Sequence, residues 1–435
     1  MNFKNQFLRT STSKNITNPE HFKKQLLNWS SSFREVVFLD SNSYPQKYSS
    51  YDCLLAVDAL TSLQTDYQNA FEDLRQYQQT TKDWLFGYLS YDLKNDTEAL
   101  HSRNFDGLNF PDLFFFQPKK LFLLKGNELE MSYLKMCDDE IESDFKTIVE
   151  SQKSKFESNP AITIQQRVSK ENYLSKVGTM LEHIHRGDIY EANFCMEFYA
   201  ENSRINPFEI YLKLNAISDP PFAAFLKNDK QFLMSASPER YLRKEQNKII
   251  SQPIKGTAKR SNDATEDENI KQELLASQKE RSENIMIVDL VRNDLSKTAA
   301  KDSVQVEELC GAYSFKQVHH LISTIVSQLD IQSTGFEVIK TTFPMGSMTG
   351  APKISAMQII ENLEETKRGV YSGAIGYFTP SGDYDFNVII RSILYNAQKD
   401  YVSFSVGSAI TAESMPEMEY EECLLKAKAM FTVLK

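Results

Sequence analysis

Short apolar runs between residues 33 and 125 predict strands mixed with short helices. The clearest runs are V-V-F-L-D, W-L-F-G-Y-L-S-Y-D and K-L-F-L-L-K, and runs of this length and composition are typical of strands. The stretch from Asp138 to Arg167 is charged, lacks glycine and contains Asn159-Pro160, which predicts a helix followed by a connector. We therefore divide the chain at about residue 160, into an N-terminal region (1–160) and a second region (161–435).

An amphipathic helix is predicted to follow, from Lys170 to Arg186. Its apolar residues recur three or four positions apart, which places them on one face of a helix. Ser169 is a suitable N-cap, and Gly187 is a suitable end. The apolar face consists of Tyr173, Val177, Leu181 and Ile184.

The run from residue 256 to residue 269, G-T-A-K-R-S-N-D-A-T-E-D-E-N, has almost no apolar residues. A run of this composition cannot bury itself, so we expect a surface loop or a mobile lid.

A second stretch, F-P-M-G-S-M-T-G-A-P-K, is expected to be a turn that opens a helix, with Pro352 in the first turn. Free N–H groups at a helix start attract anions. The stretch is not a P-loop, because Gly346 and Gly350 are four apart and Pro352 precedes Lys353 where that motif requires glycine. A carboxylate would fit as well as a phosphate. The helix is expected to bury Ile354, Met357 and Ile360.

The chain of 435 residues could form two or three domains or one large enzyme fold. Its hydrophobic content of 41% is sufficient for a buried core. The net charge of −10 argues against a protein that coats nucleic acid, because such binding depends on clustered Lys and Arg. An anionic substrate would therefore need local cations.

The five cysteines show no C-x-x-C spacing, and an odd number makes a poor disulfide framework. We expect a reducing compartment. The N-terminus has no apolar signal segment, and no stretch approaches the roughly 20 apolar residues of a membrane span. The expected location is therefore cytoplasmic, with no membrane association. The cysteines are Cys53, Cys137, Cys195, Cys310 and Cys423.

Two predicted helices carry carboxylates three residues apart, which places each pair on one helix face. The first has Glu280 and Glu283, and the second has Glu419 and Glu422. Either face alone is typical of a solvated helix, and Ser277 with Glu280 would also make a capping box. If the two faces meet in one cleft, four carboxylates need a cation, and an all-oxygen site suits Mg²⁺.

Arg391 ends an apolar run, D-F-N-V-I-I-R, where an ordinary surface cation is the usual alternative. The small residues G-S-A-I at 407–410 would let a ligand approach the backbone closely. Residue chemistry alone therefore indicates a Mg²⁺ site beside cations that could hold a small substrate with a carboxylate.

Lys255, in S-Q-P-I-K-G-T-A-K-R, follows a strand-like run. Most lysines at such positions are solvated. A salt-bridge partner and a nucleophile are the other two interpretations.

From Asn172 to Ala429 the chain resembles the chorismate-binding enzymes, which include anthranilate synthase component I, aminodeoxychorismate synthase component I, isochorismate synthase and salicylate synthase. This resemblance implies an α+β fold in which two antiparallel sheets form a sandwich flanked by helices. The N-terminal third is more weakly similar. The matching blocks are G-D-I-Y-E-A-N-F, S-P-E-R, P-I-K-G-T, E-R-S-E-N-I-M-I-V-D-L-V-R-N-D-L, G-S-M-T-G-A-P-K, R-G-V-Y-S-G-A-I-G-Y, D-F-N-V-I-I-R-S and E-Y-E-E-C-L-L-K-A.

The resemblance also implies roles for individual residues. The Mg²⁺ cluster that holds the ring carboxylate of chorismate would be Glu280, Glu283, Glu419 and Glu422. The enolpyruvyl carboxylate would be held by Arg391, Tyr371 and the backbone at Gly407, Ser408 and Ala409. The ring side would be lined by His320, Thr349 and Lys426, with Gly256 and Thr257 forming the wall behind it.

Glu239 in S-P-E-R matches the general acid that protonates the departing 4-hydroxyl. We expect nearby carboxylates to keep it neutral. The alternative for Glu239 is an ion pair with the adjacent Arg240.

Two positions bear on the reaction within the family. Isochorismate and salicylate synthases have a water-activating lysine at the position of Glu191, and the amine-transferring members usually have glutamine. P-I-K-G-T resembles the aminodeoxychorismate synthases, in which the lysine attacks C2 as the 4-hydroxyl leaves and ammonia then displaces it at C4. Such a lysine must be neutral, so we expect burial or a nearby cation to lower the pKa of Lys255.

The expected product is 4-amino-4-deoxychorismate, on the route to 4-aminobenzoate and folate. The chain shows no amidotransferase signature and no lyase segment after Lys435, so we expect a separate glutamine amidotransferase subunit to supply ammonia. Anthranilate synthase component I is the alternative within the family. A non-catalytic chorismate or amino-acid sensor on the same fold is the alternative outside it.

Overall fold

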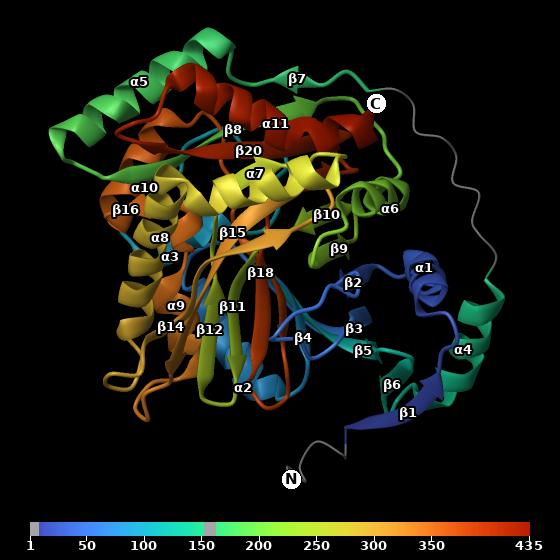
Figure 1. The fold of residues 1–435 in the computed structure, drawn as a ribbon. Helices are drawn as coiled ribbons and strands as arrows, with labels where there is room; N and C mark the ends of the chain where they lie inside the picture. Colours follow the sequence, from blue (N-terminus) through green and yellow to red (C-terminus); the bar gives the residue numbers. More distant parts are fainter. Residues whose placement is uncertain (1–7, 152–161) are drawn as a thin grey trace.

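The computed structural model describes residues 8–151 and 162–435, and within them the chain is a mixed α+β structure (Figure 1). The boundary expected near residue 160 lies outside the described residues. None of the described helices is long and apolar enough to cross a membrane. The helices are α1 Pro19–Trp29, α2 Ala70–Thr81, α3 Lys94–Thr97, α4 Ile141–Glu150, α5 Lys170–Arg186, α6 Pro207–Ser218, α7 Ala264–Ala276, α8 Gln278–Ser296, α9 Gly335–Thr342, α10 Lys353–Leu363 and α11 Pro416–Leu434.

The strands form two arms of antiparallel ladders that meet at β5 (Leu113–Lys125), which pairs with β3, β4 and β6. The first arm runs from β3 through β2, β9, β10, β19 and β20 to β8, and the second from β4 through β17, β18, β11 and β12 to β15. The first-arm strands are β3 Cys53–Thr65, β2 Glu35–Asp40, β9 Phe222–Asn228, β10 Gln231–Ser237, β19 Ser392–Asn396, β20 Tyr401–Thr411 and β8 Glu191–Ala200. The second-arm strands are β4 Leu85–Leu89, β17 Ala374–Phe378, β18 Tyr384–Val388, β11 Arg240–Glu245, β12 Lys248–Gln252 and β15 Val318–Gln328. The remaining strands are β1 Arg9–Asn15, β6 Glu128–Leu134, β7 Gln165–Gln166, β13 Ile254–Lys259, β14 Gln305–Ser314 and β16 Gly350–Ala351.

The two arms pack face to face, which confirms the expected α+β sandwich. Successive side chains of a strand point to opposite faces, and β2 shows this clearly. Val37 and Leu39 enter the cluster that also contains Phe86 and Tyr377 of the second arm. Val36 and Phe38 enter the cluster beneath the helices that cover the first arm. The core therefore has one layer between the arms and one under the outer helices.

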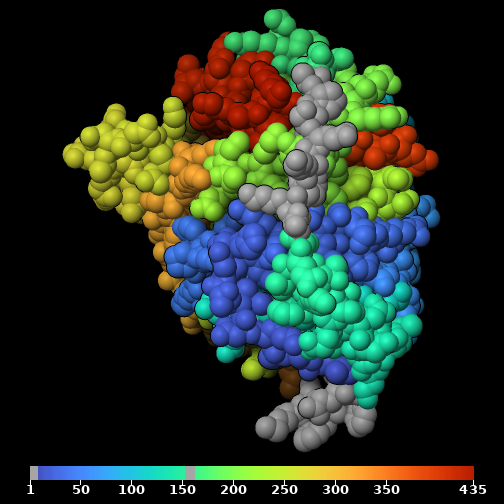
Figure 2. Space-filling model, turned by 90° about the vertical axis from the view of Figure 1, so that its right-hand side faces the viewer, coloured from blue at the N-terminus to red at the C-terminus, as the bar shows by residue number. Residues whose placement is uncertain are grey.

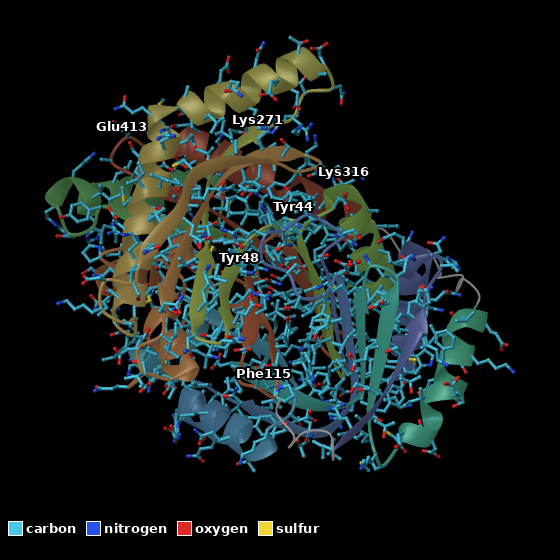
Figure 3. The ribbon with its side chains drawn as sticks, turned by 60° about the horizontal axis from the view of Figure 1, so that its bottom comes forward. Tyr44, Tyr48, Phe115, Lys271, Lys316 and Glu413 are labelled. Atoms are coloured by element: carbon cyan, nitrogen blue, oxygen red, sulfur yellow. The ribbon has the colours of Figure 1, made fainter. Side chains whose placement is uncertain are left out.

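Strands from the N-terminal region complete both arms. β2 pairs with β9, and β4 pairs with β17. The loop after β2 lies against the later region, where the Tyr44 ring stacks on Phe315 with centroids 5.2 Å apart (Figure 3). Residues 8–151 accordingly form the lower half of one face of the molecule, in blue and blue-green (Figure 2).

The helix predicted from Lys170 to Arg186 is confirmed as α5. The Ser169 side chain accepts a hydrogen bond from the Asn172 N–H, and Gly187 ends the helix in the left-handed conformation at φ +89°. Leu181, expected on the buried face, is only half-buried, and Met180 is fully buried instead.

The prediction of a surface loop over residues 256–269 is wrong, because most of this run is regular structure. Its first residues belong to β13, which pairs with β15, and its last belong to α7. The polar side chains are satisfied by one another. Asp263 caps α7, and Asp267 accepts hydrogen bonds from Arg260 and contacts His319. Side-chain bonding thus replaces the missing apolar burial.

The helix after the glycine-rich turn also differs in detail. Pro352 is the N-cap of α10 rather than a first-turn residue. Ile354 is 48% exposed, and Ile359 is buried in its place along with Met357 and Ile360.

A buried ion pair joins α10 to the strands behind it. The Arg368 and Glu364 side chains are 2.6 Å apart and almost inaccessible. Arg368 also donates to the backbone oxygens of Met348 and Asn193, and Glu364 accepts from the Cys195 N–H. The pair therefore anchors β8 and the turn before β16.

Replacing Arg368 by methionine should destabilise the fold by about 3–5 kcal/mol, because Glu364 would stay buried without its cation. The measurement is the free energy of unfolding in urea. Arg204→Met is the matched control, since Arg204 pairs with Asp400 while 82% exposed, and such pairs contribute about 1 kcal/mol or less. Equal losses in the two variants would contradict this role for the Arg368 pair.

Candidate active site

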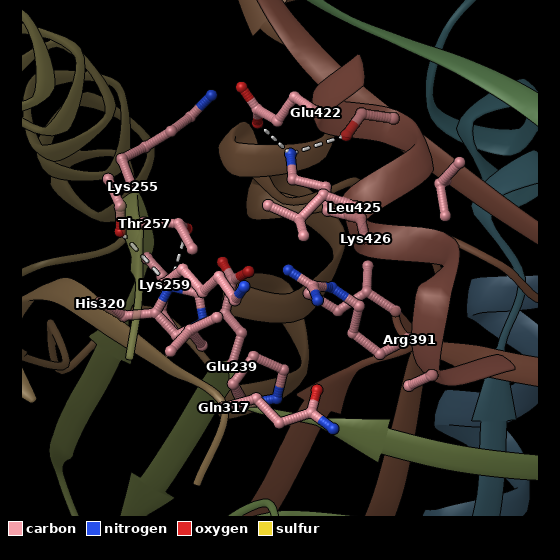
Figure 4. Close-up of a pocket in the computed structure, with 18 of the residues that line it drawn as sticks. Glu239, Lys255, Thr257, Lys259, Gln317, His320, Arg391, Glu422, Leu425 and Lys426 are labelled. Carbon is pink, nitrogen blue, oxygen red and sulfur yellow. Dashed lines mark hydrogen bonds and ion pairs between the residues drawn. The ribbon is translucent and has the colours of Figure 1, made fainter. Parts of the chain in front are cut away.

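A cavity of about 570 Å³ opens between the two arms at the end where α8 and α11 meet them (Figure 4). Its walls come from β15 of the second arm, β13, which pairs with β15, β20 of the first arm, and the two helices. Lys255, Thr257 and His320 lie on one side of the close-up, and Arg391 and Lys426 on the other.

All but two of the residues expected at the site line this cavity. The lining includes Glu239, Lys255, Gly256, Thr257, Glu280, Glu283, His320, Tyr371, Arg391, Gly407, Ala409, Glu419, Glu422 and Lys426. Thr349 and Ser408 are buried just outside it. The Thr349 hydroxyl lies 3.2 Å from the Gly346 backbone oxygen, and the Ser408 hydroxyl lies 3.1 Å from the Tyr173 hydroxyl. These two side chains therefore support the cavity wall from outside the cavity.

Glu239 lies between β10 and β11 and is 4% exposed. Burial raises the pKa of Glu239 to about 7. The expected cause, nearby carboxylates, is therefore wrong. The alternative pairing is also wrong, because Arg240 binds Asp385 at 2.9 Å. A carboxyl group that titrates near neutral pH can serve as a general acid.

Lys255 is held by a carboxylate that sequence reasoning did not connect to it. Its Nζ lies 2.6 Å from Oε1 of Glu191, at the start of β8, and both side chains are largely buried. Burial lowers the pKa of Lys255, but the negative charges of Glu191 and Glu283 outweigh it, so the pKa is raised. The expected lowering of this pKa is wrong for the protein without substrate.

Two pairs of glutamates face the same cavity, one pair from each helix. Burial raises the pKa of Glu283 to about 7, and it raises the pKa values of Glu280 and Glu419 as well. Burial would also raise the pKa of Glu422, yet Lys426 at 2.5 Å holds it below its usual value. Among the described residues, no three acidic, His or Cys side chains converge as metal ligands would.

Only half of the expected capping box is present in the described residues: Ser277 caps α8 by accepting from the Glu280 N–H. The Glu280 carboxylate faces the cavity, and its Oε2 lies 3.2 Å from where a Cβ on Gly256 would be. Gly256 has φ +90°, so a larger residue there would be strained and would crowd this carboxylate.

Burial shifts the pKa values of His320 and Arg391, which both line the cavity. Burial, together with the charge of Arg391, lowers the pKa of His320 to about 3. His320 is therefore neutral at physiological pH, and its Nδ1 lies 2.9 Å from the Thr257 hydroxyl. Burial likewise lowers the pKa of Arg391, so the surface-cation alternative for Arg391 is wrong. Lys426 donates to the Gly407 backbone oxygen at 2.8 Å.

Several residues at the site were not found from the sequence. Asn193 lines the floor, Asn284 donates to the Lys255 backbone oxygen at 3.3 Å, and Lys259, Lys279 and Lys316 line the walls. No local pattern marks them, because they belong to four separate parts of the chain, with Lys279 and Asn284 both on α8.

Comparisons with known proteins agree with this geometry. The model of the chorismate binding enzyme family matches residues 34–432. The chain is 34% identical over 355 residues to an anthranilate synthase component I-like protein of Synechocystis, covering 81% of this chain and 72% of the relative. It is 38% identical over 271 residues to aminodeoxychorismate synthase component 1 of Escherichia coli, covering 62% of this chain.

The matched part spans 59% of the Escherichia coli relative and 30% and 33% of two plant aminodeoxychorismate synthases. The crystal structure of anthranilate synthase component I from Streptococcus pneumoniae has the same fold. It superposes with a TM-score of 0.77 at 23% identity and covers 90% of this chain and 95% of that one. Because the family model covers almost the whole chain, the protein belongs to the chorismate binding enzyme family.

Proposed function

We propose that this protein is an aminodeoxychorismate synthase component I, which converts chorismate and ammonia to 4-amino-4-deoxychorismate. The observation that carries the proposal is Lys255, whose amine lines the cavity within the P-I-K-G-T block. The relatives named aminodeoxychorismate synthase reach 38% and 39% identity, which supports the same choice.

Arg391 and Lys426 would bind the carboxylates of chorismate. They lie on one side of the cavity, and Tyr371 lines it as well. Burial strengthens the attraction between an unsolvated guanidinium and a carboxylate. The neutral His320 ring would then contact the substrate ring without adding charge.

Glu239 would act as the general acid at the 4-hydroxyl. Hydroxide is a poor leaving group, so its departure needs a proton. A pKa of about 7 leaves a large protonated fraction of Glu239 near neutral pH. Lys255 would attack C2 during this departure, and ammonia would displace it by attack at C4.

Glu280, Glu283, Glu419 and Glu422 would hold Mg²⁺, directly or through water. Burial raises the pKa values of three of these carboxylates, so a bound cation would favour their charged forms, and all-oxygen donors suit this ion. When bound, Mg²⁺ would neutralise the ring carboxylate of chorismate. To bind the metal, Glu422 would have to give up its ion pair with Lys426.

Anthranilate synthase component I remains the second candidate, because relatives with that name are 32% and 36% identical to this chain. A sensor without catalysis is less well supported, since a binder needs neither a general acid nor a buried lysine amine. The name "component 1" of the Escherichia coli relative supports a separate glutamine amidotransferase as the source of ammonia.

Lys255→Ala should lower the rate of 4-amino-4-deoxychorismate formation by at least about a hundredfold, on the scale of losing a covalent step. Lys255→Arg should not restore the rate, because guanidinium stays protonated. The measurement is product identity and rate by chromatography with chorismate, Mg²⁺ and saturating ammonium. Anthranilate as the wild-type product would select the second candidate, and an active arginine variant would exclude a nucleophile.

Glu283→Gln and Glu422→Gln should each weaken Mg²⁺ binding by at least about tenfold, because each removes an anionic ligand. Titration calorimetry with Mg²⁺ measures this without any reaction. Glu421→Gln is the control, since Glu421 lies on α11 and is 64% exposed in its contact with Lys170. Unchanged Mg²⁺ affinity in both cavity variants would exclude the four-glutamate site.

The purified chain should form product with ammonium salts, at a rate that rises with pH as NH₃ becomes more abundant, and should not use glutamine. The check is product formation with each nitrogen donor at equal concentration. Turnover of glutamine by the pure chain would contradict a separate amidotransferase.

A further inference from the structure

The ion pair between Lys255 and Glu191 poses a chemical problem for the proposed function. An amine attacks only when it is neutral, yet in the structure the ammonium of Lys255 sits against the carboxylate of Glu191 at 2.6 Å. A proton must therefore leave Nζ before any bond to the substrate can form.

Glu191 is built to receive that proton. The residue is 1% exposed, and the strands on both sides of β8 fix its position, since it pairs with Thr411 of β20 and Ala351 of β16. Its second oxygen, Oε2, is buried and has no hydrogen-bond partner in residues 8–151 and 162–435. Oε1 contacts the ammonium, and Oε2 is buried without a partner among the described residues. Once the ammonium loses its proton, the carboxylate therefore gains little from staying charged.

The other charged groups near Lys255 are less suited to this role. Glu422 is bound by Lys426, and within the described residues the nearest ion-pair contact of Glu283 is Lys279 at 3.9 Å. Both glutamates are also proposed metal ligands. Within the described part of the chain, only Glu191 is hydrogen-bonded to Nζ. The charged groups around Lys255 are Glu191 on β8, Glu239 before β11, Lys279, Glu280 and Glu283 on α8, and Glu422 and Lys426 on α11.

We propose that Glu191 is the proton acceptor that activates Lys255. The carboxylate takes one proton from the ammonium across the existing hydrogen bond, which gives a neutral carboxylic acid and a neutral amine. The amine then forms the C2–N bond, the C4–O bond breaks, and Glu239 gives its proton to the departing hydroxyl to form water. The positive charge returns to the lysine nitrogen, and the negative charge moves to Glu239. This role rests on the proposed function.

The consequence is a distinctive pH dependence. If the proton moves within the pair, no proton need be released to solvent, so activation of the lysine adds no pH dependence while the pair holds one proton. Without the Glu191 carboxylate, Lys255 must lose its proton to water. Its rate of attack relative to wild type should then rise about tenfold per pH unit below the lysine pKa.

The experiment compares wild type with Glu191→Gln, which keeps the shape and removes the charge. Glu197→Gln is the matched control, because Glu197 is a buried glutamate on the same strand that pairs with Arg167 away from the cavity. Chorismate and Mg²⁺ are added without ammonium, and the amount of substrate attached to Lys255 is measured by mass spectrometry after rapid quenching. Glu239, with a pKa of about 7, loses its proton over this range in every protein, so the rate of each variant is divided by the wild-type rate at the same pH. From about pH 6.5 to 8.5 this ratio should stay constant for Glu197→Gln and rise for Glu191→Gln.

A second measurement needs no substrate. Labelling of Lys255 by a small amine-specific reagent, followed over pH by mass spectrometry with Mg²⁺ present, gives the midpoint at which the amine becomes neutral. The midpoint should fall by about one pH unit or more in Glu191→Gln and stay unchanged in Glu197→Gln. Should Glu191→Gln fail to fold, Glu191→Asp keeps a carboxylate and should keep the wild-type pH profile at a lower rate.

The outcomes separate this inference from the proposed function. Adduct formation with the same pH profile in wild type and Glu191→Gln, or an unshifted labelling midpoint, would overturn the role of Glu191 alone. The absence of any adduct on Lys255 in all proteins would overturn the lysine nucleophile, and this role with it.

Discussion

The pairing of β5 with neighbours from both arms is the constraint on which the rest of the structure depends. β5 pairs along its length with β3 on one edge, and with β4 and then β6 on the other edge. The register between β3 and β5 shifts between Ala59 and Thr61, opposite Pro118, where proline cannot donate to the ladder. The sheet divides near this irregularity into two faces that must cover each other. The cavity forms where the two arms separate again, beneath α8 and α11.

The site itself is an arrangement of opposite charges in one cavity. Its four clustered carboxylates come from α8 and α11, while Lys255 lies on one side of the close-up and Arg391 and Lys426 on the other (Figure 4). Several of these groups are buried or half-buried, so their charges depend on neighbours as well as on bulk water. A doubly charged substrate and a divalent cation would complete this balance. The same logic explains why Lys255 is an ammonium: the carboxylates around it favour the charged form of its amine.

Sequence reasoning located most of this site but not its internal contacts. Regular patterns were reliable: the caps at Ser169 and Gly187 set the ends of α5, because they act through local backbone bonds. The family blocks brought the lining residues together, although side chains such as Thr349 turn away from the cavity. The pairing of Lys255 with Glu191 could not be predicted, since these residues are 64 positions apart and meet only when β8 and β13 face each other. The polar run after Gly256 was misjudged because its side chains bond to one another, which hydropathy does not reveal.

Residues 8–151, the described part of the N-terminal region, contribute no side chain to the cavity wall, yet β2 and β4 cover the edges of β9 and β17. A fragment that began after the first 151 residues would therefore present two unpaired strand edges, each with free N–H and C=O groups and an apolar face. Such edges are templates for pairing with other molecules. Residues 8–151 thus protect the half that lines the cavity from association through its sheet edges.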